Sequence, residues 1–452
     1  MTEKERIDIM SHSATDTLCT DQYEPWLWER LEWYQDMKFG LFIHWGLYSQ
    51  WGCIESWPLV EEDIWARPDD LECWVKRDKD LERFRRDYWN LNTSFNPKKF
   101  NPQVWAEAAK YAGMKYIAFT TKHHDGYCMF DTKTTDYKVT APETPFHSNP
   151  KANIVKEVFD TFRENGFAID CYFSKSDWKS PYYWDPTRLA HDRNPNYDTH
   201  AEPERWEKFK KFVYNQIEEL MSDYGHIDAL WLDGGQVRPP DQDIRMDLIT
   251  EMARKHQPGL IIADRTVGGL YENIITPEQE IPEEPLGHPW ESCLTMGTSW
   301  GIKFNDTYKS SRELIHMLVE IVAKGGNFLL NIGPDADGAF PDITLERLRD
   351  IGDWMAVNGE AIYGTRAIAP YQEENIRFTQ KAGKVYAIIL TDENKTIESV
   401  TISAILPAVN SEIFMLGNDK PLKWELCDSC ARITLPSKLP SKDASTIVFT
   451  PH

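Results

Sequence analysis

The sequence lacks the long apolar runs that cross membranes, and it is short of basic residues. None of its hydrophobic stretches reaches the roughly 18 residues that a transmembrane helix needs. Its 50 Lys and Arg face 72 Asp and Glu, which gives a formal net charge of −22. This balance argues against nucleic acid, and against an anionic membrane surface, as the main partner. An acidic surface of this kind is typical of a soluble protein.

Cysteine is present, but not in a pattern that predicts disulfides or a metal site. The eight cysteines form no disulfide framework, and a chain of 452 residues does not need one. A CxxC spacing at residues 427–430 has no second pair and no histidine nearby, so we expect no metal there. The sequence also contains no His-Glu-x-x-His motif. We therefore expect neither a metal nor an organic cofactor.

The first six residues are mostly charged or polar, and no apolar segment of the kind found in signal peptides follows them. We expect a cytoplasmic protein, or a periplasmic or secreted one if a signal has been removed.

From residue 39 onward, short apolar runs alternate with helical patterns. Helices are predicted at 25–35, 102–112, 153–165 and 204–224, and candidate strands at 39–45, 116–122, 167–174, 227–233, 259–265 and 327–333. Repeated strand–helix units predict an α/β protein with a parallel sheet and helices outside it. The length up to about residue 360 suits a (β/α)8-like barrel. A doubly wound sheet is the alternative, but no Gly-x-Gly-x-x-Gly follows the first strand.

The sequence pattern changes after a last amphipathic helix, predicted from Thr344 to Tyr363. Beyond it, short alternating runs separated by turn residues predict a C-terminal antiparallel β-sandwich. We therefore divide the chain into a barrel domain, residues 1–364, and a sandwich, residues 365–452. Residues 53–95, rich in tryptophan and charge, are an insertion after the first strand, and loops of this length usually carry function.

Polar side chains end three of the predicted strands. Residues 122–126 (Lys-His-His-Asp-Gly) follow one strand, Asp233 ends a second, and His44 ends a third. In parallel α/β proteins, ligands bind at the carboxyl ends of strands. Adjacent histidines on a strand point to opposite faces, which disfavours a shared zinc or iron ion. Hydrogen bonding to several hydroxyl groups suits these histidines better.

Carboxylates at this edge indicate the chemistry. Asp233 could be a nucleophile, a metal ligand, or only a turn residue before two glycines. A glycosidase needs a second carboxyl group, and Glu278 and Glu291 are the candidates. Glu278 lies in an irregular acidic loop, whereas Glu291 opens an apolar run and is expected at the start of a strand.

Taken in order, these residues resemble the α-L-fucosidase family of glycoside hydrolases (family 29). The similar stretches are 38–46, 95–105, 112–116, 122–126, 172–174, 177–178, 230–234, 276–278, 290–291 and 327–334. The resemblance implies a (β/α)8-like barrel followed by a C-terminal β-sandwich. It also implies a retaining exo-α-L-fucosidase whose partner is a fucosylated glycan, and it leaves the oligomeric state open.

The resemblance assigns roles residue by residue. It makes Asp233 the nucleophile that forms a covalent fucosyl-enzyme, and Glu278 the acid/base, in a mobile loop. Glu291 is the alternative acid. The fucose ring would be held by His44, His123, His124, Tyr172, Trp231 and Arg265.

One stretch departs from the family pattern, which has a Glu-Trp pair that contacts fucose hydroxyls. Residues 55–57 read Glu-Ser-Trp, so Trp57 keeps its place while Glu55 stands one position early. On an extended segment this shift turns the carboxylate to the other side. The departure keeps two alternatives open: an α-glycosidase for L-galactosides or modified fucosides, and a catalytically silent sugar-binding protein. We expect leaving-group selectivity to lie in the insertion, with its tryptophans Trp57, Trp65, Trp74 and Trp89.

Overall fold

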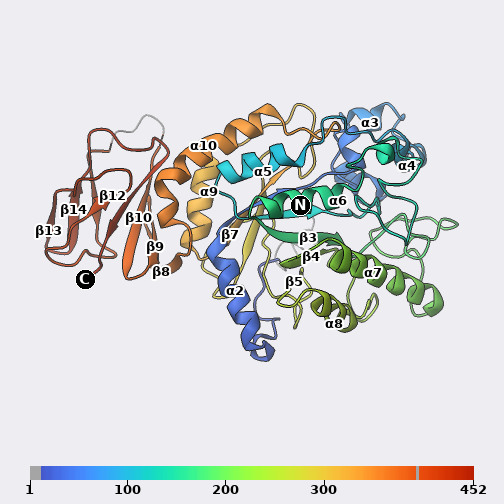
Figure 1. The fold of residues 1–452 in the computed structure, drawn as a ribbon, viewed down its shortest axis with the longest axis horizontal. Coiled ribbons are helices and arrows are strands. Elements are labelled where there is room, and N and C mark those ends of the chain that lie inside the picture. Colours follow the sequence, from blue (N-terminus) through green and yellow to red (C-terminus); the bar gives the residue numbers. More distant parts are fainter. Residues whose placement is uncertain (1–11, 393–396) are drawn as a thin grey trace.

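The computed structural model describes residues 12–392 and 397–452. Its larger part is a curled parallel sheet surrounded by helices, and its smaller part is a pair of antiparallel sheets at one end of the molecule (Figure 1). The predicted class, a (β/α)8-like barrel followed by a C-terminal antiparallel β-sandwich, is confirmed.

The parallel sheet has seven strands among the described residues, in the order β5-β4-β3-β2-β1-β7-β6. Their bounds are β1 Phe39–Ile43, β2 Tyr116–Thr120, β3 Ala168–Ser174, β4 Ala229–Asp233, β5 Ile261–Asp264, β6 Glu291–Thr295 and β7 Asn327–Ile332. Each candidate strand of the sequence corresponds to one of them, and β6 begins at the predicted Glu291. Strands β1, β2 and β7 are buried at every residue, as their apolar runs predict.

The ring is closed by an irregular segment, residues 272–278, between the two edge strands. Glu272 forms an antiparallel bridge with β5, and Glu278 forms a parallel bridge with Cys293 of β6. The backbone N–H of Cys293 donates to the carbonyl of Pro277 at 3.0 Å. The loop expected to carry the acid is therefore fastened to the barrel wall by backbone hydrogen bonds.

Helices cover the outside of the barrel, and their bounds are α5 Pro102–Tyr111, α6 Ile154–Glu164, α7 Pro203–Asp223, α8 Met246–His256, α9 Ser311–Ala323 and α10 Asp342–Asn358. Asparagine side chains cap the starts of α5 and α6, and Ser310 and Glu313 form a capping box at α9. Helix α10 stops at Asn358, before the predicted end, and residues 359–361 continue as a 3₁₀ turn. None of the helices in the described part of the chain is long and apolar enough to span a bilayer.

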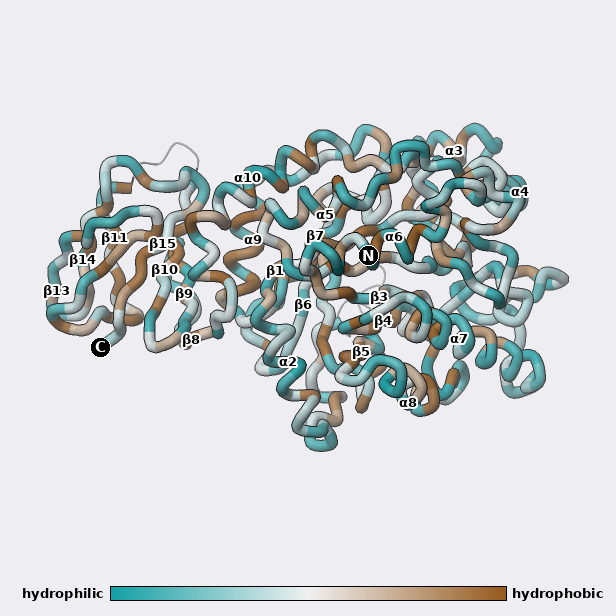
Figure 2. Tube along the Cα trace, in the orientation of Figure 1, coloured by the Kyte–Doolittle hydropathy of each residue, from teal (hydrophilic) through white to brown (hydrophobic). Residues whose placement is uncertain are grey.

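Helix α2 (Pro25–Met37) closes the amino-terminal end of the barrel. Its Leu27, Leu31 and Tyr34 belong to the apolar cluster inside the sheet, with Phe42 and Trp231. Figure 2 shows hydrophobic colour concentrated along the strands and hydrophilic colour on the outer helices. With one end of the barrel plugged, the carboxyl ends of the strands form the open end.

The insertion after β1 contains two short helices, α3 (Glu72–Val75) and α4 (Leu81–Trp89). In Figure 1 they lie at the end of the molecule farthest from the sandwich.

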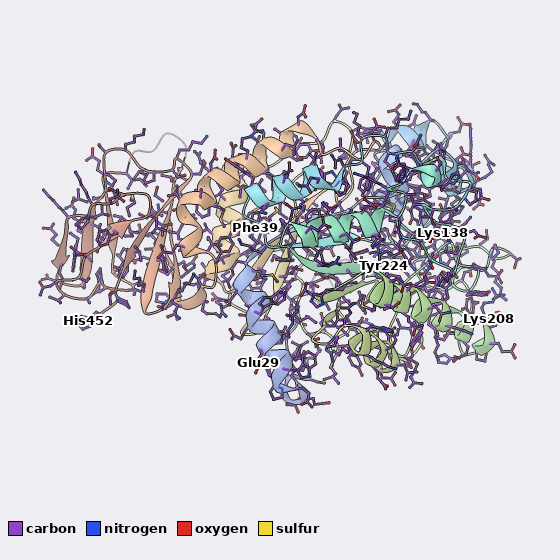
Figure 3. The ribbon with its side chains drawn as sticks, in the orientation of Figure 1. Glu29, Phe39, Lys138, Lys208, Tyr224 and His452 are labelled. Atoms are coloured by element: carbon purple, nitrogen blue, oxygen red, sulfur yellow. The ribbon has the colours of Figure 1, made fainter. Side chains whose placement is uncertain are left out.

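The C-terminal sandwich joins a five-stranded and a three-stranded sheet, in the orders β12-β15-β10-β9-β8 and β11-β14-β13. The bounds are β8 Arg366–Glu373, β9 Ile376–Lys381, β10 Lys384–Leu390, β11 Ser399–Ile402, β12 Phe414–Met415, β13 Trp424–Cys427, β14 Cys430–Thr434 and β15 Ala444–Phe449. The larger sheet packs against α9 and α10. In Figure 3, Phe39 at the start of β1 is near the centre of the view, and His452 is at the far end of the sandwich.

Candidate active site

Strand periodicity brings the predicted residues to one rim of the barrel. Side chains alternate along a strand, so every second residue faces the interior. In β4, Ala229 and Trp231 belong to the interior cluster, and Asp233 follows on the same face at the end of the strand. His44 likewise continues the interior face of β1, two residues after Phe42. The open end of the barrel therefore gathers polar groups above an apolar interior.

Asp233 is the centre of this cluster, and both of its carboxylate oxygens have donors. Oδ1 accepts from Nη1 of Arg265 at 3.0 Å, and Oδ2 accepts from the hydroxyl of Tyr172 at 2.6 Å. Burial opposes the negative charge, but Arg265, the neighbouring histidines and the hydrogen bond from Tyr172 together outweigh it and hold the pKa of Asp233 well below its usual range. The carboxylate is therefore ionised at neutral pH, and its side chain keeps 19% exposure, as a nucleophile requires.

Arg265 joins Asp233 to a second carboxylate. While Nη1 bonds Asp233, Nη2 donates to Oε2 of Glu278 at 2.8 Å. The guanidinium lies over the ring of Trp231, 4.1 Å from its centre, and the side chain is almost fully buried. Two carboxylates on neighbouring nitrogens of one guanidinium lie side by side, which is compatible with the separation of about 5–5.5 Å in retaining glycosidases.

Glu278 is the more accessible of the two carboxylates, with 32% of its side chain exposed. Burial raises the pKa of Glu278, whereas Arg265 and His12 lower it. The lowering is the larger effect, so the pKa of Glu278 is below its usual value. Asp233 acts in the opposite direction, because its negative charge raises the pKa of Glu278. The protonation of Glu278 is therefore coupled to the charge on Asp233.

His44 presents a hydrogen-bond acceptor to the site. Burial lowers its pKa to about 4, so the imidazole is neutral. Its Nδ1 lies 2.7 Å from Oδ1 of Asn331, whose amide nitrogen donates to the carbonyl of Trp300. Because the amide oxygen can only accept, Nδ1 carries the proton and Nε2 keeps its lone pair. The ring of Trp300 packs 5.0 Å from that of His44.

His124, like His44, presents a hydrogen-bond acceptor to the site. Burial lowers its pKa to about 4. Nδ1 lies 2.6 Å from the hydroxyl of Ser174, which itself donates to the carbonyl of Ser176, so Nδ1 is the donor. Nε2 is buried, has no hydrogen-bond partner among the described residues, and lies 3.6 Å from Oδ2 of Asp233. Two acceptors that face each other fit a hydroxyl group that donates between them.

His123, His124 and Asp233 can each offer one atom within 4.8 Å of the others, the arrangement of a metal-binding group. However, both oxygens of Asp233 already have donors, and the guanidinium of Arg265 repels a cation at this point. The donor set therefore suits sugar hydroxyls better than a metal ion.

Glu291 is placed where it cannot reach a substrate. It is fully buried at the start of β6 and accepts hydrogen bonds from the hydroxyls of Tyr34 and Tyr116. Its Oε1 also accepts from Nε1 of Trp231 at 3.3 Å. Glu291 thus anchors the ring on which Arg265 lies, and the geometry favours Glu278 over Glu291 as the acid/base.

The structure corrects the prediction for residues 55–57. We expected an extended segment, but Glu55 has a φ of 38° and Ser56 is helical, so the chain turns here. Oε1 of Glu55 accepts from the backbone N–H of Gly301 at 2.5 Å and from Ser299. Among the described residues, the fully buried Glu55 therefore contacts the backbone beside Trp300, and no contact with the two catalytic candidates is formed.

Ser56 instead fills the position next to the histidine pair. Its hydroxyl lies 2.6 Å from Nδ1 of His123, where burial lowers the pKa of that imidazole well below its usual range. Trp57 also lies at the site, because its ring packs 4.8 Å from the ring of His124.

Within residues 122–126, only the two histidines face the site. Lys122 is buried and bonds Asp177 at 3.1 Å, and Asp125 accepts from a buried tyrosine hydroxyl. Gly126 has a φ of 77°, and a Cβ there would lie 2.2 Å from Oδ1 of Asp177. The charged members of the motif therefore build the turn that presents the histidines.

Sequence reasoning missed His12. Its Nδ1 lies 2.9 Å from Nη2 of Arg265, and its Nε2 lies 3.9 Å from Oε2 of Glu278. Because arginine can only donate, Nδ1 is the acceptor in this pair. A single histidine in an irregular lead-in has no periodic pattern around it, so no sequence signal identified it.

Fold and site together define the class of protein. A barrel that keeps two carboxylates close together at its rim, one of them firmly ionised, has the groups that glycoside hydrolysis requires. Neutral imidazoles and aromatic rings around the carboxylates suit the hydroxyls and apolar faces of a sugar. The class is therefore that of the glycoside hydrolases.

Comparison with known families is more specific. The family model described as Alpha-L-fucosidase matches residues 17–360, and the Alpha-L-fucosidase C-terminal domain matches residues 370–450. The chain belongs to the α-L-fucosidase family, and the resemblance seen in the sequence is confirmed.

Individual relatives are similar to this chain over almost its whole length. The plasma alpha-L-fucosidase of Pongo abelii is 30% identical over 440 residues, covering 92% of this chain and 87% of the relative. The tissue alpha-L-fucosidase of Bos taurus is 28% identical, covering 96% of this chain and 92% of the relative. Among solved structures, alpha-L-fucosidase isoenzyme 1 from Paenibacillus thiaminolyticus has a TM-score of 0.74 at 31% identity, covering 94% of this chain and 100% of that one. The Thermotoga maritima alpha-fucosidase in complex with a mechanism-based inhibitor has a TM-score of 0.75 at 29% identity, covering 94% and 98%.

Proposed function

We propose that the protein is a retaining exo-α-L-fucosidase that removes terminal α-L-fucose from oligosaccharides or glycoconjugates through a covalent glycosyl-enzyme. The observation that carries the proposal is the contact of Arg265 with both Asp233 and Glu278, which keeps a nucleophile and an acid/base side by side. The Thermotoga maritima alpha-fucosidase, 28% identical to this chain, was solved in complex with fucose. This supports fucose as the sugar bound here.

In the first step, Asp233 attacks the anomeric carbon while Glu278 protonates the leaving oxygen. Glu278 must hold a proton at this stage, so the bound substrate has to weaken its contact with Arg265. The negative charge on Asp233 helps, because it raises the pKa of Glu278.

In the second step, Glu278 acts as a base towards water. Formation of the ester removes the negative charge of Asp233, so the pKa of Glu278 falls. The change in charge on one carboxylate thereby converts the other from acid to base.

The neutral imidazoles hold the ring. Nε2 of His124, and Nε2 of His44 by its tautomer, accept from sugar hydroxyls. Trp57, Tyr172 and Trp231 supply aromatic surface around them, and Tyr172 also fixes Oδ2 of Asp233.

The test is a substrate panel with the released sugar identified and its anomer observed by NMR. We expect an aryl α-L-fucoside to release the α-anomer of fucose first, and an aryl α-L-galactoside to react more slowly. First release of the β-anomer would overturn the retaining mechanism, and preference for the galactoside would overturn the assignment of the sugar.

A further inference from the structure

We propose that Ile64 and Trp65 form a binding site for the sugar ring on the leaving-group side of the scissile bond. The occupant is a neutral pyranose of a fucosylated oligosaccharide. This inference rests on the proposed function and names the part of the substrate that the insertion after β1 recognises.

Ile64 and Trp65 are adjacent large apolar side chains that remain exposed. They lie in a 3₁₀ turn of the insertion, and 73% of Ile64 and 46% of Trp65 are exposed. Single exposed apolar residues are common, but an exposed isoleucine–tryptophan pair next to an active site marks a binding surface.

The exposed indole is nevertheless held in one orientation. Nε1 of Trp65 donates to Oδ1 of Asp63 at 3.2 Å, and Asp63 is itself buried. Arg193 clamps the same carboxylate with two bonds of 3.0 Å, from Nε to Oδ2 and from Nη2 to Oδ1. A ring that is fixed before the ligand arrives loses little conformational entropy on binding.

A row of rings connects Trp65 to the nucleophile. His124, beside Asp233, packs against Trp57 with ring centres 4.8 Å apart, and Trp57 packs against Trp65 at 6.1 Å. The guanidinium of Arg193 covers Trp57 at 4.3 Å. In the proposed arrangement, fucose at Asp233 occupies the inner end of this row, and the sugar attached to it extends towards the outer end, at Trp65.

The surface around Ile64 and Trp65, called the wall below, is built from the insertion and from the loop that carries Arg193. The two loops support each other. The carbonyl of Arg193 accepts from Nε1 of Trp178 at 3.2 Å and from the hydroxyl of Tyr183 at 3.1 Å. The backbone N–H of Glu62 in the insertion donates to the carbonyl of His191 at 2.9 Å. Both loops therefore hold their positions without a ligand.

The chemistry of the wall specifies a neutral sugar. An indole face beside an aliphatic side chain matches the apolar face of a pyranose ring. The carboxylate of Asp63 balances the charge of Arg193, so the pair that holds Trp65 contributes no net charge that would select an acidic ligand.

The test compares two substrates that share the fucose but differ in leaving group. α-L-Fucosyl fluoride places nothing on the wall, whereas 2′-fucosyllactose and 3-fucosyllactose place a sugar there. We expect Trp65→Ala to lower kcat/KM for the hydrolysed fucosyllactose by about 3- to 10-fold, the range of an aromatic stacking contact, and to leave the fluoride unchanged. Trp65→Phe, which keeps a ring but loses the bond to Asp63, should fall in between.

Trp28 of α2, 39% exposed, is the matched control, and Trp28→Ala should change neither substrate. An equal loss on both substrates, or no loss on either, would overturn the proposed site. If the wild-type enzyme fails to hydrolyse fucosyl fluoride itself, the proposed function fails instead, so the two outcomes are distinguishable.

Discussion

His44 and His124 lie beside two carboxylates and yet stay neutral, because burial lowers the pKa of each imidazole to about 4. Side-chain oxygens of Asn331 and Ser174 accept from their Nδ1 atoms, which leaves Nε2 as an acceptor in each ring. These two imidazoles therefore add no charge beside Asp233, Glu278 and Arg265, and in the proposed function they recognise hydroxyls without competing for protons.

The assignment of Glu278 as acid/base is tested by azide rescue of alanine variants. Glu278→Ala should lose activity towards a natural oligosaccharide by 10²-fold or more, an order of magnitude typical of a missing general acid. Azide should restore turnover of an aryl fucoside and give the α-fucosyl azide, since azide replaces water in the second step.

Glu291→Ala is the comparison for this experiment. It should lose stability and activity together with no rescue, because its carboxylate is sealed among Tyr34, Tyr116 and Trp231. Rescue of Glu291→Ala, with none for Glu278→Ala, would reverse the assignment.

Glu55 should make the fold sensitive to alkaline pH. Burial raises its pKa to about 7, above the ordinary value of about 4.3, so the folded state favours the protonated form. The stability from this proton is fully present below pH 4.3 and is lost as pH rises through 7. Glu55→Gln has no such loss, so its stability relative to wild type should grow between pH 5 and 8, by at most about 3 kcal/mol.

Urea unfolding at several pH values measures this difference. Glu62→Gln, at an exposed glutamate of the same insertion, is the matched control for the change from Glu to Gln. A difference between Glu55→Gln and wild type that stays flat from pH 5 to 8 would contradict the account.

How far single residues could be predicted depended on whether a strand fixed them. Asp233 ends one apolar run and His44 follows another, so their place at the rim could be predicted from the sequence. The orientation of Glu55 could not be predicted, because a positive φ at this residue changes where its side chain points. The sequence pattern alone does not indicate which residues adopt a positive φ. His12 approaches from an irregular segment, and only tertiary structure brings it to Arg265.

At the scale of elements, the strands were predictable and the closing segment was not. Apolar runs located six of the seven strands because both faces of a parallel sheet are buried, and for β6 only its start at Glu291 was expected. Residues 272–278 close the ring through isolated bridges, which need no periodic pattern. That irregular segment carries Glu278, so the proposed acid/base lies on the least regular part of the barrel.

The lead-in segment before α2 should tune the pKa of Glu278, the proposed acid. His12 lies 3.9 Å from Glu278 and lowers its pKa, so His12→Ala should raise that pKa. Because Glu278 must be protonated in the first step, the alkaline limb of the kcat/KM profile should move to higher pH by a fraction of a unit. His12→Asn keeps an acceptor for Arg265 and serves as the control for that contact. A limb unchanged in His12→Ala, or moved to lower pH, would contradict this role.

At the scale of the whole molecule, the barrel and the sandwich share one apolar core. Tyr386, Ile388 and Ala444 of the sandwich belong to the same buried cluster as the barrel strands and helices. Nε1 of Trp354 in α10 donates to the carbonyl of Ala444 at 2.9 Å, and Arg377 of β9 pairs with Glu320 of α9. In Figure 1, the two helices lie between the barrel sheet and the sandwich. The sandwich is therefore a structural support of the barrel, on the side away from the insertion.

This shared core predicts that the two parts unfold together. Trp354→Ala removes a buried indole and its bond to the sandwich, which should cost about 3–5 kcal/mol. Calorimetry should show a single transition with a lower midpoint, while activity of the folded variant on fucosyl fluoride stays near that of wild type. Two separate transitions, with the barrel transition unshifted, would show that the parts are independent.

The proposed mechanism depends on a covalent ester between Asp233 and the sugar. The most direct measurement is mass spectrometry of the enzyme after reaction with 2-deoxy-2-fluoro-α-L-fucosyl fluoride, whose ring fluorine slows release of the intermediate. We expect one added 2-fluorofucosyl group on the peptide that contains Asp233, and none in Asp233→Ala. A label on Glu278 or Glu291, or full turnover of wild-type enzyme with no label at all, would contradict it.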